Sequence, residues 1–111
     1  MPTIAVTKTE SIKGLTATWP ALAAGDDGAS VATQGNKTTV QVSGTFGTST
    51  VTLQGSNDGV IWTNLNDESV PGNACSFTTN GLKGVLQAPK FIKPFVSPGT
   101  GTGLTVLVFN R

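Results

Sequence analysis

The sequence contains no histidine, and this absence excludes much of the chemistry by which enzymes work. Serine and cysteine triads require an imidazole, and histidine is the commonest general base, so neither kind of site can form. Acidic residues are also few, and five of the six fall in predicted loops, where solvated turn residues are usual: Asp26, Asp27, Asp58, Asp67 and Glu68. A glycosidase needs two carboxylates across one cleft, and no such pair is evident. We therefore expect a protein that is not an enzyme and that carries no cofactor.

Charge of either sign is scarce. Asp, Glu, Lys and Arg make up 12% of the chain, about half of the roughly 25% found in an average soluble protein. Thr, Ser, Asn and Gln fill the deficit, so less charge must be desolvated when this surface is buried against a partner. The net charge of +1 is spread without basic runs, so we expect neither nucleic acid nor a membrane surface as a partner.

Long apolar runs are also missing. No run approaches the ~18 residues that a membrane-spanning helix requires, and residues 1–14 lack the pattern of a signal peptide. Cys75 is the one cysteine, so no internal disulfide can form. These features predict synthesis in a cytoplasm, with Cys75 as a small buried hydrophobic residue.

The chain is instead rich in short segments in which apolar and polar residues alternate. This period of two is typical of half-buried strands, and residues that favour turns separate the segments. The predicted strands are 3–9, 14–19, 29–33, three within 38–66, 74–78, an ambiguous 82–87, 90–97 and 104–111. At this length residues 1–111 form one domain. We predict an all-β fold: a small antiparallel β-sandwich, jelly-roll or immunoglobulin-like, with about eight short strands and no substantial helix.

The segment Thr38–Asn66 is the predicted centre of this fold. Its alternation predicts three consecutive antiparallel strands, a meander, with turns at Gly44–Ser49 and Gly55–Gly59. The Asp-Gly pair in the second turn favours the positive φ of a tight hairpin. Val60–Leu65 would then be the third strand of the meander.

Both ends of the chain have features of an interface. Residues 1–10 are either a first strand of the same sheet or an arm that pairs with a neighbouring subunit, because exposed strand edges template either pairing. The last segment, 104–111, is apolar on both faces, with Leu107 and Phe109 opposite three other apolar residues. One face of a sandwich sheet normally meets water, so this strand predicts a covering element or a subunit interface.

Two loops place oxygen-bearing side chains together, as a Ca²⁺ site requires: Asp26 with Asp27, and Asn57 with Asp58. Neither has the carboxylate spacing of a known calcium motif, so we interpret both as turns and predict no metal. The Gly99–Gly103 run lacks the ending of a phosphate loop and is predicted as a flexible connection.

The two tryptophans have two interpretations. Trp19 and Trp62 lie in predicted strands, and a tryptophan in a small β domain usually packs in the core because of the apolar area it buries. The alternative is that Trp62, exposed beside Asn57 and Asp58, stacks on a sugar ring.

Two motifs carry a resemblance to a known family. Val40–Gly47 reads Val-Gln-Val-Ser-Gly-Thr-Phe-Gly, and Gly55–Trp62 reads Gly-Ser-Asn-Asp-Gly-Val-Ile-Trp. With the flanking segments 19–28 and 92–111, this pattern resembles a recurrent small virion-associated protein of tailed bacteriophages. One departure from the pattern is Lys93, which stands before a proline at a position where the pattern has arginine. A lysine cannot form the bidentate hydrogen bonds that an arginine makes with a carboxylate.

The resemblance implies a head decoration or cement protein on the capsid surface of the virion. Its implied partners are the major capsid protein and further copies of the chain, as a dimer or a trimer. The residues we expect at these interfaces are Ile4, Val6, Phe91, Lys93, Phe95, Leu107 and Phe109. The hairpin 54–64 also resembles that of discoidin-like sugar-binding sandwiches, so the alternative is a carbohydrate-binding module for host-surface adhesion, with Asn57, Asp58 and Trp62 as its ligand residues.

Overall fold

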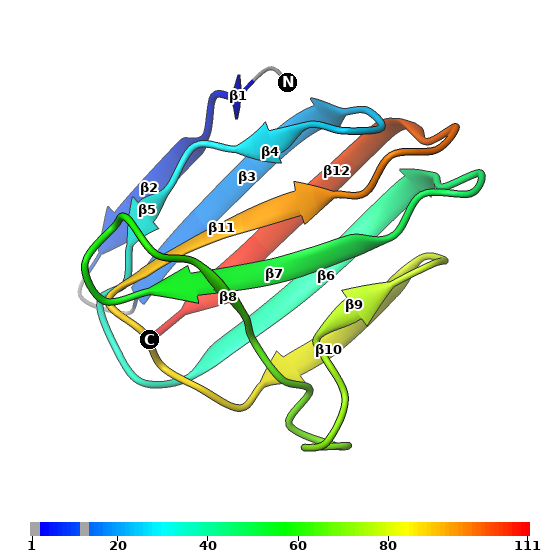
Figure 1. The fold of residues 1–111 in the computed structure, drawn as a ribbon. Helices are drawn as coiled ribbons and strands as arrows, with labels where there is room; N and C mark the ends of the chain where they lie inside the picture. The colour runs from blue at the N-terminus through cyan, green and yellow to red at the C-terminus, as the bar shows by residue number, and fades with distance from the viewer. Residues whose placement is uncertain (1–2, 12–13) are drawn as a thin grey trace.

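The computed structural model describes residues 3–11 and 14–111, whose strands form two facing β-sheets (Figure 1). No helix occurs among these residues, so the predicted all-β sandwich is confirmed. The strands are β1 Thr3–Ile4, β2 Thr7–Ser11, β3 Gly14–Leu22, β4 Asp27–Gly28, β5 Val31–Ala32, β6 Thr38–Thr45, β7 Val51–Ser56, β8 Thr63–Asn64, β9 Ser76–Phe77, β10 Gly81–Val85, β11 Phe91–Val96 and β12 Thr102–Asn110. They outnumber the eight or so expected partly because β1 and β2 divide the predicted segment 3–9 and because β4 lies in a predicted loop. Five of the strands have only two residues.

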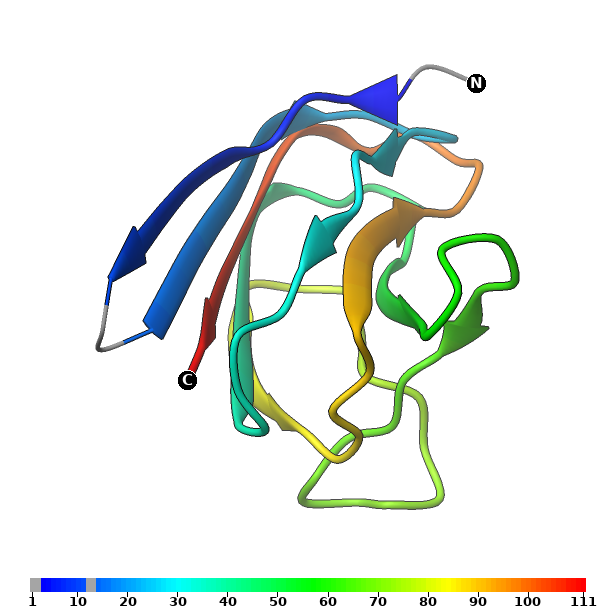
Figure 2. The ribbon, with the colours of Figure 1, turned by 90° about the vertical axis from the view of Figure 1, so that its left-hand side faces the viewer.

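The order of the strands defines a jelly roll. The five-stranded sheet has the order β10-β6-β12-β3-β2, and the seven-stranded sheet has the order β1-β4-β11-β7-β8, with β5 beside β11 and β9 beside β7. From β3 onward the chain alternates between the sheets: β3, then β4 and β5, then β6, then β7 to β9, then β10, β11 and β12. Figure 2 shows the two layers from the side. This alternation distinguishes the jelly roll from the immunoglobulin-like alternative.

The predicted three-stranded meander is wrong. β6 lies in the five-stranded sheet and β7 in the seven-stranded sheet, so the turn after β6 carries the chain across the sandwich. Only the second turn makes a hairpin, in which Gln54 of β7 pairs with Asn64 of β8. The alternation in both strands indicated which side chains point inward, and it was satisfied equally well by two strands that face one another across the core.

The third strand of that meander is also much shorter than predicted. Within the predicted Val60–Leu65 strand, only Thr63–Asn64 pairs as a strand. Val60 and Ile61 belong instead to a loop and are 79% and 73% exposed. Their β-branched side chains favour a strand by propensity, but the loop conformation is imposed by hydrogen bonds to Asp58 that are described below.

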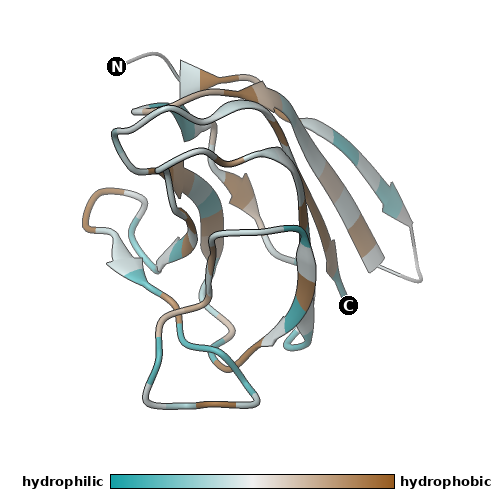
Figure 3. Cartoon of the chain, turned by 90° about the vertical axis from the view of Figure 1, so that its right-hand side faces the viewer, coloured by the Kyte–Doolittle hydropathy of each residue, from teal (hydrophilic) through white to brown (hydrophobic). Residues whose placement is uncertain are grey.

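The core lies between the sheets and is built from the inward residues of the longer strands. Trp19 is fully buried, as the first of the two interpretations predicts, and its Nε1 donates a 2.8 Å hydrogen bond to the carbonyl oxygen of Ala29. Figure 3 shows the alternating bands of hydrophobic and hydrophilic residues along the strands. The core residues are Leu15, Ala17, Trp19, Leu22, Val31, Val40, Val42, Phe46, Val51, Leu53, Leu65, Cys75, Phe77, Val85, Ile92, Val96, Leu104, Val106 and Val108.

The described part of the N-terminal segment pairs within its own chain. β1 runs parallel to β4 in the seven-stranded sheet, and β2 forms the edge of the five-stranded sheet beside β3. Ile4 and Val6 are partly buried against the core. Within this chain residues 3–10 therefore pair with its own two sheets, and residues 1 and 2 lie outside the described part.

Candidate functional site

Among residues 3–11 and 14–111, no group of three or more metal-ligating side chains is found. Nor does this part of the chain contain a helix long and apolar enough to cross a membrane. Asp26, Asp58 and Asp67 accept hydrogen bonds from nearby backbone amides, as turn residues do. Asp26 and Asp67 are nevertheless buried and not solvated as predicted, and Asp27 lies in β4 and not in a loop. The candidate sites are therefore three surfaces, which we describe in turn.

The first surface is the outer face of the seven-stranded sheet, where β11 alternates outward and inward residues. Phe91, Lys93 and Phe95 point outward and are half-buried, while the residues between them are buried. Lys93 Nζ lies 3.0 Å from Asp27 Oδ2, and only 18% of each of these two side chains is exposed. The same ammonium lies 4.8 Å from the centre of the Trp62 ring. Lys93 therefore has its carboxylate and its aromatic neighbour within its own chain.

The loop between β7 and β8 is organised by Asp58. Its Oδ1 accepts hydrogen bonds from Ser56 Oγ at 2.8 Å, from the amide of Val60 at 2.9 Å and from the amide of Ile61 at 3.0 Å. The two backbone bonds, more than the bond from Ser56, lower the pKa of Asp58 to about 2. Gly59 has the positive φ, +77°, that the Asp-Gly pair predicted. The turn is not the tight Gly55–Gly59 hairpin expected, because β7 continues to Ser56 and residues 57–62 form a longer loop before β8. The carboxylate is thus used to hold the loop.

This ordered loop ends in an exposed apolar tip formed by Val60 and Ile61. These are the two most exposed large hydrophobic residues in the described chain. Their amides are fixed by Asp58, so the tip is held in one conformation while its side chains face water. An exposed aliphatic pair on a fixed loop is typical of a contact element for another macromolecule.

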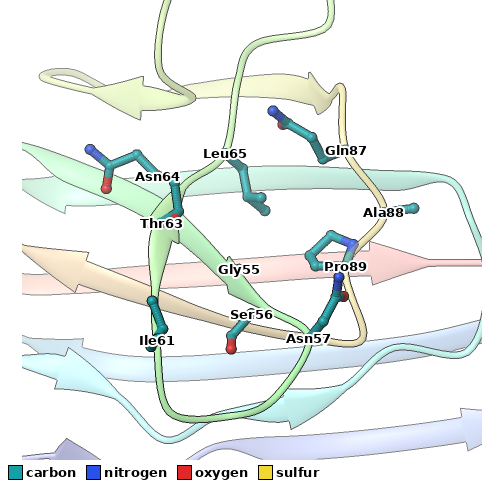
Figure 4. A pocket seen from close by; sticks show the side chains of 10 residues that line it. All are labelled: Gly55, Ser56, Asn57, Ile61, Thr63, Asn64, Leu65, Gln87, Ala88 and Pro89. Atoms are coloured by element: carbon teal, nitrogen blue, oxygen red, sulfur yellow. The ribbon is translucent and has the colours of Figure 1, made fainter.

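Beside this loop lies the second surface, an open groove of about 360 Å³ (Figure 4). The β7–β8 hairpin forms one side, and the connection from β10 to β11 forms the other. Gly55 allows the two to approach, because a Cβ at this position would lie 2.5 Å from Pro89 Cγ of the connection. The lining mixes neutral polar with apolar side chains: Gly55, Ser56, Asn57, Ile61, Thr63, Asn64, Leu65, Gln87, Ala88 and Pro89.

Of the three predicted ligand residues, only Asn57 lines this groove. Its Oδ1 accepts a 2.9 Å hydrogen bond from the amide of Lys90, which leaves its Nδ2 as the group that a ligand would meet. Asp58 holds the loop, and Trp62 lies against Lys93. The sequence offered no signal for Gln87 and its neighbours, because they reach the groove only through the path of the chain between the two sheets.

The third surface is the outer face of the five-stranded sheet, on which Leu107 and Phe109 of β12 lie. Leu107 is half-buried and Phe109 is 40% exposed, while Leu104, Val106 and Val108 point into the core. The doubly apolar strand that the sequence shows is thus central to its sheet, with one set of side chains in the core and the other uncovered within this chain.

The seven residues expected at interfaces do not form one surface. Phe91, Lys93 and Phe95 lie on one outer face of the sandwich, and Leu107 and Phe109 lie on the other. The remaining two, Ile4 and Val6, pack against the core of their own chain. A protein that used all the exposed members would contact partners on both sides.

Cys75 is fully buried, which confirms its prediction as a small core residue. Burial raises the pKa of its thiol to about 11, and the nearby Asp67 carboxylate adds to this shift. The thiol is therefore protonated at neutral pH and has little nucleophilic character.

Comparison with known proteins adds little to this description. No protein-family model matches the chain, and no curated protein matches it. A solved cupin domain from Bordetella pertussis Tohama I has 12% sequence identity, covers 100% of this chain and 99% of its own, and gives a TM-score of 0.39. A likeness at this level carries no argument about the fold or the function of this chain.

Proposed function

We propose that this protein is a non-enzymatic structural protein of a tailed bacteriophage, a head decoration or cement protein that binds the capsid exterior and stabilises the shell. The motifs at Val40–Gly47 and Gly55–Trp62 support the phage assignment through their resemblance to that family. The observation that carries the proposal is the apolar tip, Val60 and Ile61, held on a fixed loop at 79% and 73% exposure. Its place of action is the capsid surface, and its partner is the major capsid protein.

The free energy expected from burying the Val60–Ile61 tip suits a protein that binds the capsid in many copies. Burying the two aliphatic side chains of the tip would contribute about 3 kcal/mol per copy, and little conformational entropy is lost because Asp58 already orders the loop. This is weak for one contact, but attachment at two points on neighbouring capsid subunits raises the effective affinity. Small modules that bridge subunits in this way reinforce the shell against internal pressure.

The test is co-sedimentation of the purified protein with expanded capsids assembled from the major capsid protein of the same genome. We expect the wild-type protein to sediment with the capsids and the V60S/I61S double variant to bind about 100-fold more weakly, as a loss of about 3 kcal/mol requires. V70S is the matched control, because Val70 is also exposed, at 48%, but lies in a different loop. A wild-type protein that stays in the supernatant, or a double variant that binds equally well, would refute the proposal.

The groove favours a second candidate function, binding of an uncharged carbohydrate. Its amide side chains, Asn57, Asn64 and Gln87, are suited to sugar hydroxyl groups, and Ile61 and Pro89 offer apolar contacts. A glycan array followed by calorimetric titration tests this candidate. We expect N64A to abolish binding and N36A, an exposed asparagine outside the groove, to leave it unchanged. A wild-type protein that binds no glycan on the array removes the candidate.

A further inference from the structure

The outer face of the five-stranded sheet is built from aligned cross-strand rows. One row runs across all five strands, from β2 to β10, and consists of Thr7, Thr18, Leu107, Gln41 and Leu82. The next row consists of Thr9, Thr16, Phe109, Thr39 and Gly84. A partial third row pairs Thr105 with Ser43. Because directly paired residues point to the same side of a sheet, the side chains in these rows share one face.

None of these twelve positions carries a charged residue, and of the three large apolar residues two lie side by side at the centre while Leu82 lies on the edge strand β10. Leu107 and Phe109 lie on β12, the middle strand of the five, and hydroxyl or amide side chains flank them on β3 and β6. The nearest charges lie beyond the ends of the rows. Arg111 follows Phe109 by two residues and pairs through its backbone with Lys37, and Lys37 lies 3.1 Å from Glu68, whose carboxylate is beside Gly84. An apolar centre within an uncharged polar rim is the anatomy of a protein–protein interface.

We propose that this face is a dimerisation surface, which packs against the same face of a second copy of the chain with Leu107 and Phe109 at the centre. The contact is sheet on sheet, with the side chains of the two faces interdigitated, as between the layers of a β-sandwich. It goes beyond the proposed capsid binding, which uses the Val60–Ile61 tip on the other sheet, and it does not depend on that proposal.

The size of the face suits this occupant. Five strands spaced about 4.8 Å apart, with a mean of about seven residues of 3.4 Å each, present a face of about 24 by 24 Å, or about 600 Å². Standard stable interfaces bury about 800 Å² on each partner, which the face and its rim together approach.

The lack of charge favours a second copy over an unrelated partner. In a two-fold interface each residue near the axis meets itself or its close neighbours, so any charge there would face its like. The twelve positions of the rows avoid this conflict, and they hold the hydroxyl groups of six threonines, which can hydrogen-bond to one another. An interface with a different protein has no such constraint and usually includes complementary charges.

Both edges of the five-stranded sheet are protected against pairing with a strand of another copy. Two copies would therefore associate through the outer face of the sheet. At the β2 edge, Lys8 and Glu10 pair with core residues of β3, so they point toward the inner side of the sheet, where they form a 3.4 Å ion pair. Inward-pointing charges oppose the addition of another strand. At the β10 edge, the amide of Glu68 donates a 3.0 Å hydrogen bond to the carbonyl oxygen of Gly84, and Asp67 forms an isolated antiparallel β-bridge with Val85. The segment 67–68 therefore covers this edge.

Sedimentation equilibrium of the full chain tests the proposal. We expect twice the monomer mass for the wild-type protein at low salt. Gln41 is exposed and lies next to Leu107, so Q41K and Q41E should each raise the dimer dissociation constant at least about tenfold by like-charge repulsion. Mixing the two variants should restore the dimer, since opposite charges then meet across the interface.

A32K is the matched control, because it adds the same charge on an exposed residue of the seven-stranded sheet and should stay dimeric. Circular dichroism melting of each variant verifies that it is folded. A wild-type protein that remains a monomer at about 100 µM, well above the dissociation constant of a standard interface, would overturn the proposal, as would Q41K and Q41E variants that dimerise like the wild type. A monomeric wild-type protein whose capsid binding is lost in Q41K would assign the face to the capsid protein instead, whereas a dimer that fails to bind capsids would refute only the proposed function.

Discussion

The ammonium of Lys93 lies 3.0 Å from the carboxylate of Asp27, and this ion pair ties β11 to β4 on the outer face of the seven-stranded sheet. The Trp62 ring covers the same ammonium at 4.8 Å. One face of the tryptophan considered as a sugar platform is therefore occupied by its own chain. The loop that carries the apolar tip is in turn attached to the sheet through this contact.

Replacing Lys93 with methionine should destabilise the protein by about 2 kcal/mol, because it leaves Asp27 without its partner in a largely buried setting. Urea unfolding measures the loss, and the emission of Trp62 should shift while that of the buried Trp19 does not. K37M is the control, since Lys37 and Glu68 are 58% and 42% exposed and such surface pairs contribute less than about 0.5 kcal/mol. Equal losses of unfolding free energy in K93M and K37M would contradict the argument that burial makes the Lys93–Asp27 pair the more important one.

Asn110 should be among the most sensitive polar positions in the chain. Its fully buried side chain accepts hydrogen bonds from the amides of Gln34 and Gly35 and donates to Thr38 Oγ1 at 2.8 Å, so it fixes the connection that leads into β6. N110A leaves these groups unpaired, and we expect a loss of about 3 kcal/mol in urea unfolding. The exposed Asn36, in the same connection, is the control, and N36A should change stability by less than about 0.5 kcal/mol.

The loop after β7 should loosen in acid. The pKa of Asp58 is about 2 in the folded chain and 3.8 ordinarily, so folding favours the ionised carboxylate. The ordering that it provides is complete above pH 3.8 and is lost as the pH falls through about 2. Amide chemical shifts of Val60 and Ile61 should therefore titrate in this window. D58N keeps an amide oxygen as acceptor but cannot titrate, and a transition that persists in this variant would assign the effect to another group.

A single methyl group at Gly28 should disrupt the packing between β3, β4 and β11. A Cβ there would lie 2.6 Å from Pro94 Cδ and equally close to Trp19 Nε1, and neither ring can move aside within the core. We expect G28A to lower the free energy of unfolding by about 2 to 3 kcal/mol. G72A is the matched control, because a Cβ at Gly72 meets nothing within 4 Å. Thermal unfolding of the two variants compares them, and similar melting temperatures would show that the site can expand.

The strand content of the fold could be predicted, but the partners of the strands could not. The alternation in β6 and β7 indicated correctly that Val40, Val42, Val51 and Leu53 point inward. It did not reveal that the two strands face one another across the core, because a hairpin and a crossing between sheets bury the same residues. The Asp58-Gly59 turn was predictable because its chemistry is local.

The residues of the candidate sites divide in the same way: those marked by local sequence were predictable, and those brought together by the path of the chain were not. Leu107 and Phe109 stand out in the sequence as apolar residues on the second face of a strand, and the structure leaves them on an outer face. The groove could not be predicted, since Asn57 and Gln87 come together only where the connection between the sheets passes the β7–β8 hairpin. Trp62 was predicted to pack in the core, with a ligand site as the alternative. The structure leaves it half-buried, outside the core and against Lys93, about thirty residues away in sequence.

The sequence by itself determined what depends on local chemistry: an all-β chain, the inward face of each long strand, the turn at Asp58, and a surface with little charge. Only the tertiary structure decided which strands pair, which outer face each exposed apolar residue occupies, and that the Val60–Ile61 segment is a loop and not a strand. The physical reason is that side-chain alternation reports burial on one side of a strand and carries no information about the neighbour. In a jelly roll the neighbours come from distant parts of the chain, and their pairing is chosen by packing across the whole core.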